Sequence, residues 1–69
     1  MNDFRNKISE IAHQYKLSCD TFARAQEQSG VGISALRNMI NVNKDVRLGT
    51  VLAVLDASGY ELVLKRKDR

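Results

Sequence analysis

Hydrophobic residues near the start of the chain recur with the period of an α-helix. Their spacing places them on one stripe of a helix with about 3.6 residues per turn. These residues are Phe4, Ile8, Ile11, Ala12 and Tyr15. Asn2 or Asp3 can accept hydrogen bonds from the free amides at the start of such a helix. The pattern predicts a first helix over residues 3–16 with this stripe buried.

Three further helical segments follow, marked by glycines or capping residues. The second covers residues 21–29, with Thr21 or Ser18 as its N-cap and Gly30 as the left-handed residue that ends it. The third extends from about residue 32 to residue 40, and the fourth from about residue 48 to residue 58. Residues 41–47 form a polar loop between them. The apolar set of the third helix is Val31, Leu36, Met39 and Ile40. The fourth helix is expected to bury Leu48, Val51, Leu52 and Leu55.

The segment after Gly59 has a different pattern. Residues 60–64 alternate enough to predict a short strand, although a fifth helix or a frayed end is the alternative. A single strand in a helical chain leaves its backbone amides and carbonyls unpaired, and the same strand of a second copy can satisfy them. We therefore expect a homodimer. The residues expected at its interface are Tyr60, Leu62, Val63 and Leu64.

Length and composition limit the chemistry available to the chain. Its 69 residues form one small domain, residues 1–69, and a core of that size gives marginal stability, which also favours oligomerisation. Cys19 is the only cysteine and His13 the only histidine, so a four-ligand zinc site of Cys and His is excluded, and we expect no metal and no cofactor. The unpaired thiol, the absence of an apolar leader and an apolar run of only residues 51–55 predict a cytoplasmic protein without a membrane span.

The positive charge is concentrated at the end of the chain. Eleven Lys and Arg against eight Asp and Glu give a net charge of +3. Residues 62–69 carry this whole excess. Such a basic tail, over residues 65–69, attracts an anionic partner or simply keeps the protein soluble. Its basic residues are Lys65, Arg66, Lys67 and Arg69.

Residues 21–39 carry the strongest functional signal. Gly30 permits a sharp reversal between two short helices, and Val31 can fill the angle between them. Leu36 and Met39 anchor the second helix on the first. This is the pattern of a helix-turn-helix, whose second helix enters the major groove of DNA. The residues left to project outward are Ile33, Ser34, Arg37, Asn38 and Asn41.

Several segments are similar to those of a known family. Leu17-Ser18 enters the second helix, Gly30-Val31 forms the turn, and Ser34-Ala35-Leu36 lies in the third helix. Residues 47–52 and 56–62 match the fourth helix and its exit. Over residues 18–64 the chain resembles the Cro-like, phage-repressor-like (XRE-type) helix-turn-helix family, which includes small HipB-like antitoxins. The resemblance implies an all-α fold, a four-helix lambda-repressor-like domain, whose terminal strand pairs across a dimer.

The chain departs from that family at two places. Gln26 stands where the family usually has a small residue, and Ala25 before it stands where a larger apolar residue is common. Alternatively, Phe22 and Ala23 fill these two roles in a helix about one turn longer. Gly32 replaces the serine that usually caps the third helix, although glycine is accepted there. These departures bear on the register of the contact residues and not on the fold.

The outward residue types fit DNA. Arg37 can make the bidentate contact to guanine, Asn38 or Asn41 can pair with adenine, and Ile33 can meet a thymine methyl. For each polar residue, ordinary solvated surface is the alternative interpretation. The residues suited to phosphate contacts are Thr21, Asn43, Lys44 and Arg47.

Together these features predict a homodimeric, sequence-specific transcriptional regulator, a repressor that binds an inverted repeat in double-stranded DNA. The alternative is an antitoxin-like protein that binds and neutralises a partner protein, such as a toxin, with or without repression of its own operon. RNA binding is less favoured, because no platform of aromatic side chains is visible. We do not expect an enzyme, since His13 has no identifiable catalytic partner and Gly30-Val31-Gly32 lacks the other parts of a dinucleotide site.

Overall fold

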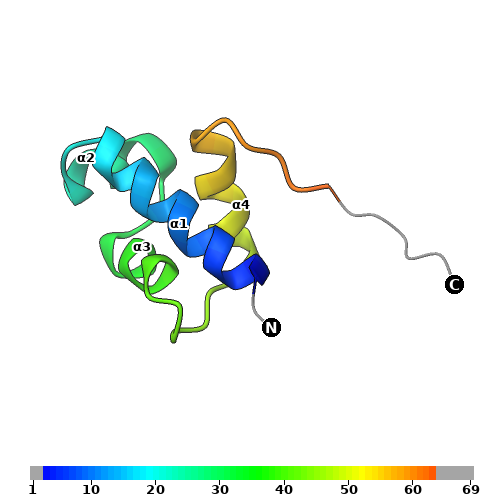
Figure 1. Cartoon of the computed structure of the whole chain (residues 1–69). Coiled ribbons are helices and arrows are strands. Elements are labelled where there is room, and N and C mark those ends of the chain that lie inside the picture. Colours follow the sequence, from blue (N-terminus) through cyan, green and yellow to red (C-terminus); the bar gives the residue numbers. More distant parts are fainter. Residues whose placement is uncertain (1–2, 64–69) are drawn as a thin grey trace, which may run out of the picture.

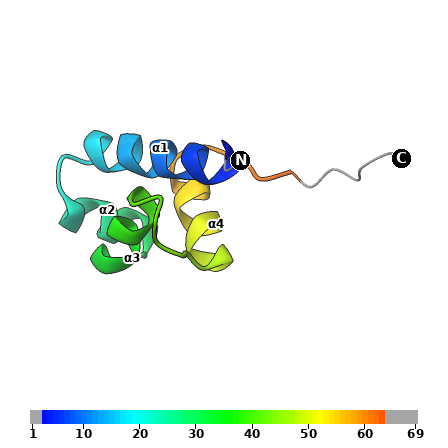
Figure 2. The same cartoon turned by 60° about the horizontal axis from the view of Figure 1, so that its bottom comes forward.

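The computed structural model describes residues 3–63, which form four α-helices and no strand. The helices are α1 (Asp3–Ser18), α2 (Phe22–Ser29), α3 (Ile33–Ile40) and α4 (Leu48–Ala57). Each of α2, α3 and α4 contacts α1, and α2 contacts both α3 and α4. Figures 1 and 2 show this arrangement, in which α1 lies across the other three helices. The all-α fold predicted from the sequence is confirmed.

The ends of α2 are set by local residues, as predicted. Thr21 is the N-cap, and its hydroxyl oxygen accepts a hydrogen bond from the Arg24 amide at 3.2 Å. Gly30 ends the helix in the left-handed region, with φ at 76°, and its amide donates to the Gln26 carbonyl at 2.7 Å. Gly32 then precedes α3 in an extended conformation. Three residues therefore connect α2 to α3 and reverse the chain.

The core lies between α1 and the other helices. The buried apolar residues are Ile8, Ile11, Ala12, Tyr15, Cys19, Ala25, Val31, Leu36, Met39, Val51, Val54 and Leu55. Val31 at the turn and both anchors of α3, Leu36 and Met39, are buried as predicted. In α2 the small buried residue is Ala25, while Gln26 is exposed. Gln26 therefore takes no part in the core.

The predicted burial is wrong at three positions. Leu48 and Leu52 are 63% and 43% exposed, and α4 buries Val51, Val54 and Leu55 instead. Residues 51–55 are all apolar, so the sequence allows more than one buried stripe through this helix. Phe4 is 59% exposed because the first turn of α1 directs Arg5, about 100° away around the helix, toward α3.

The chain leaves α4 through a glycine turn. Gly59 has a φ of 82°, and the Tyr60 amide donates to the Leu55 carbonyl at 2.8 Å. Leu62 packs against the core, whereas Tyr60 and Val63 are exposed. In this single chain residues 60–63 form no strand, so the predicted pairing across a dimer stays a prediction. Leu64 and the basic tail lie outside the described residues.

Among residues 3–63, every helix is too short or too polar to cross a membrane.

Candidate nucleic-acid interface

The outward face of α3 is polar and continuous. Ser34, Arg37 and Asn38 are exposed, and their spacing of three and four residues places them on one face of the helix, while the exposed Asn41 directly follows its last residue. The opposite face contributes Leu36 and Met39 to the core, both with no exposed surface. The α3 face thus presents a guanidinium, a hydroxyl and two amides to solvent.

Arg37 is not free of neighbouring contacts. Its guanidinium carbon lies 5.1 Å from the centroid of the Phe22 ring, at the start of α2. The Lys16 Nζ atom lies at the same distance from that ring. Cation–π contacts at such exposed sites stabilise by about 0.5–1 kcal/mol each. Phe22 therefore restrains the side chain that the sequence marks as a candidate guanine contact, a role that sequence reasoning missed.

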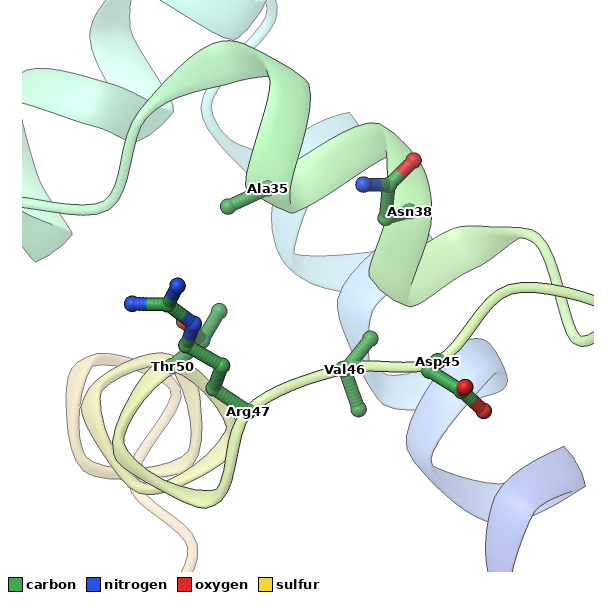
Figure 3. Close-up of a pocket in the computed structure, with 6 residues that line it drawn as sticks. All are labelled: Ala35, Asn38, Asp45, Val46, Arg47 and Thr50. Atoms are coloured by element: carbon green, nitrogen blue, oxygen red, sulfur yellow. The ribbon is translucent and has the colours of Figure 1, made fainter.

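A groove separates α3 from the start of α4. It is lined by Ala35, Asn38, Asp45, Val46, Arg47 and Thr50. Figure 3 shows the Asn38 amide on the α3 wall, and Arg47 rising beside Thr50 on the other. The small Ala35 side chain leaves the space between them open. In the same view the Asp45 carboxylate points away from Arg47, so the groove presents a cation and an amide.

The loop after α3 begins with a tight turn at Asn41. The Asn41 side-chain oxygen accepts a hydrogen bond from the Asn43 amide, and its main-chain carbonyl accepts one from the Lys44 amide, both at 3.0 Å. This turn is built by the residue itself, as Asn side chains commonly do. It leaves the NH2 group of Asn41 available as a donor, and it places Asn43 and Lys44 in solvent.

The remaining predicted contact residues are Ile33 and Thr21. Ile33 is half-buried, so it presents less apolar surface than the sequence pattern implies. Thr21 is exposed, and its hydroxyl proton remains available because only the oxygen is used in capping. Two residues of α1 that the sequence did not mark, Arg5 and Ser9, reach the far end of α3 with side-chain hydrogen bonds.

The described residues offer little for other chemistry. In residues 3–63 no group of three His, Cys, Asp or Glu side chains could hold a metal ion. Cys19 is buried and donates its thiol to the Gln28 side-chain oxygen at 3.5 Å. Burial, together with the nearby Cys19, raises the pKa of the Tyr15 phenol above its usual value, and that hydroxyl donates to the Ala25 carbonyl at 3.3 Å. These groups belong to the packing of α1 against α2.

No family model, no curated protein and no solved structure matches the chain. Its function must therefore be inferred from the side chains that the fold presents.

Proposed function

We propose that the protein is a sequence-specific DNA-binding transcriptional regulator whose α3 helix contacts bases in the major groove. The observation that carries the proposal is the polar α3 face, opposite a fully buried pair of anchors. A recognition helix needs this combination, because its outer side chains must meet base edges while the helix stays fixed to the protein. Two short helices joined by three residues at Gly30 supply the matching scaffold.

The base contacts follow from the chemistry of each side chain. Arg37 has the planar pair of donors that suits guanine O6 and N7, and Asn38 has the donor and acceptor that suit adenine. Asn41 contributes its free NH2 group and Ser34 its hydroxyl. The half-buried Ile33 supplies at most a partial contact with a thymine methyl.

Phosphate contacts flank the α3 face. Thr21 can donate its hydroxyl beside the first amides of α2, which also attract anions. Arg47 borders the groove next to Asn38, and Asn43 and Lys44 lie on the exposed turn. These contacts would set orientation on the duplex rather than sequence preference. The basic tail adds long-range attraction to the same polyanion.

A homodimer that acts as a repressor in the cytoplasm completes the proposal. In Figures 1 and 2, α4 and the segment after it lie to the right of α2 and α3, although α4 also contacts α2. They carry four exposed apolar residues: Leu48, Leu52, Tyr60 and Val63. A second copy that covers these residues would leave both α3 faces free for an inverted repeat.

The same apolar residues favour a second candidate function. An antitoxin-like protein would use them to bind and neutralise a different protein. Sedimentation of the purified chain over a range of concentrations separates the two. A dimer that Leu52→Glu converts to monomer supports the homodimer, whereas a monomer at every concentration favours the partner protein.

The proposed function is tested by selection from random duplex DNA, followed by affinity measurements on the selected site. We expect an inverted repeat. Arg37→Ala should weaken binding to it by about 1–3 kcal/mol and leave binding to random DNA nearly unchanged. The matched control is Lys7→Ala, which removes one positive charge from an exposed position on α1. Failure to select any sequence, or an equal loss on both DNAs, would refute base contact by Arg37.

A further inference from the structure

The C-terminal end of α3 lacks the usual helix-ending device. The last four carbonyls of a helix have no partner within it, and a left-handed glycine commonly brings amides back to them. Here the C-cap is Asn41, in an extended conformation with φ at −82° and ψ at 107°. Its amide satisfies only the Arg37 carbonyl, at 3.0 Å. The carbonyls of the following residues need donors from elsewhere.

Those donors come from α1. Arg5 Nη1 donates to the Met39 carbonyl at 2.8 Å. Arg5 Nη2 lies 2.8 Å from the Asn38 carbonyl, 2.8 Å from that of Asn41 and 3.1 Å from that of Lys44, so its two hydrogens are shared among three acceptors. One turn later on α1, the Ser9 hydroxyl donates to the Ile40 carbonyl. Every main-chain carbonyl from residue 38 to residue 41 thus accepts a hydrogen bond from α1.

The charge of Arg5 suits this place. The C-terminal end of a helix carries partial negative charge, which a cation stabilises. Arg5 is half-buried, and within residues 3–63 the one ion pair joins Lys7 to Glu10 instead. The guanidinium is therefore committed to main-chain oxygens. Its planar set of donors can serve several carbonyls at once, whereas a lysine ammonium offers three donors from a single point.

We propose that Arg5 is a positioning residue for DNA recognition. It holds the last turn of α3 and residues 41–44 as one unit. Three of its four acceptors belong to Asn38, Asn41 and Lys44, which are the residues assigned above to base and phosphate contacts. The consequence for DNA rests on the proposed function, but the restraint on the free protein does not.

The first test measures amide hydrogen exchange in the free protein. The variants are Arg5→Gln, Arg5→Lys and the control Lys7→Gln, which removes the same charge from α1. With Arg5→Gln we expect faster exchange at the amides of Asn41 and Lys44, by about tenfold or more, and little change in α4. Arg5→Lys should restore part of the protection. An equal acceleration throughout the chain, or none at Asn41 and Lys44, would overturn the proposal.

The second test measures affinity for the selected DNA site and for random DNA, below the melting temperature of each variant. Arg5→Gln should weaken binding to the site by about tenfold, comparable to one mismatched base pair. The loss of affinity for random DNA should be no larger for Arg5→Gln than for Lys7→Gln. Equal losses of affinity for both DNAs would mean that Arg5 contributes only its positive charge, and would overturn its positioning role.

The outcomes of the two tests are independent of each other. A wild-type chain with no sequence preference refutes the proposed function, while the exchange measurement still decides whether Arg5 restrains residues 38–44. Should Arg5→Gln prevent folding, Arg5→Lys and Ser9→Ala still remove some of the donors. A wild-type exchange pattern and wild-type discrimination in both of these variants would then overturn the proposal.

Discussion

The two ends of α3 are fixed by different means. The N-terminal end follows a three-residue turn in which Gly30 adopts a left-handed conformation and Val31 is buried. The C-terminal end is held by side chains of α1 that lie 31–39 residues earlier in the chain. The first end is therefore specified by its immediate neighbours. The second acquires its place only when α1 packs against α3, so substitutions at the two ends should have different consequences.

The largest effect is expected at Leu36, which lies between the two ends of α3. Leu36 lies in the middle of α3 with no exposed surface, and Leu36→Ala should destabilise the fold by about 2–5 kcal/mol. A domain of this size has little more stability than that, so much of the protein should be unfolded. Urea denaturation followed by circular dichroism measures the loss. Leu17→Ala, at a leucine of α1 that is 51% exposed, is the control, and equal losses in the two variants would contradict the assignment of the core.

A smaller effect is expected at the turn. A side chain at Gly30 meets open space, so Gly30→Ala should cost only the strain of a left-handed residue, about 1–2 kcal/mol. Gly49→Ala is the matched control, because Gly49 lies inside α4 and also has open space around it. There alanine should stabilise the helix by up to about 1 kcal/mol. The two urea midpoints should therefore move in opposite directions, and a shift of the same sign would refute the role of the left-handed turn.

The smallest effect is expected at the far end of α3. Ser9→Ala removes one hydrogen bond to the Ile40 carbonyl, at a cost of about 0.5–1.5 kcal/mol, while Arg5 keeps its contacts. Ser34→Ala, on the exposed face of α3, should change the free energy of unfolding by less than about 0.5 kcal/mol. Equal free energies of unfolding in the two serine variants would contradict the claim that α1 side chains hold the C-terminal end of α3.

The sequence predicted those parts of the fold that depend on local signals. Thr21 and Gly30 cap α2 as expected, and Leu36 and Met39 are buried as expected, because capping chemistry and helical spacing are properties of neighbouring residues. The prediction of which α4 residues are buried was wrong at Leu48 and Leu52. An apolar run longer than one stripe does not indicate which side faces the core, and that choice was made by packing against α1 and α2.

The candidate site also has features that the sequence predicted and features that it did not. Helical spacing correctly indicated that Ser34, Arg37 and Asn38 share one exposed face. Their contact with DNA stays a prediction. The roles of Phe22 and Arg5 could not be found from the sequence. A ring beside Arg37 and a set of carbonyls facing Arg5 arise from three-dimensional packing, and every residue carries a carbonyl, so none is marked as an acceptor.

Arg5 binds only main-chain oxygens at the end of α3. The contact that positions the site therefore does not depend on which side chains the site presents. Any residue placed at position 38, 41 or 44 still supplies the carbonyl that Arg5 needs. The side chains at positions 38 and 44 can therefore be exchanged, by evolution or by design, without loss of the contact that holds them, whereas the Asn41 side chain also builds the turn. A protein built in this way can acquire a new binding preference through single substitutions while the scaffold beneath them stays the same.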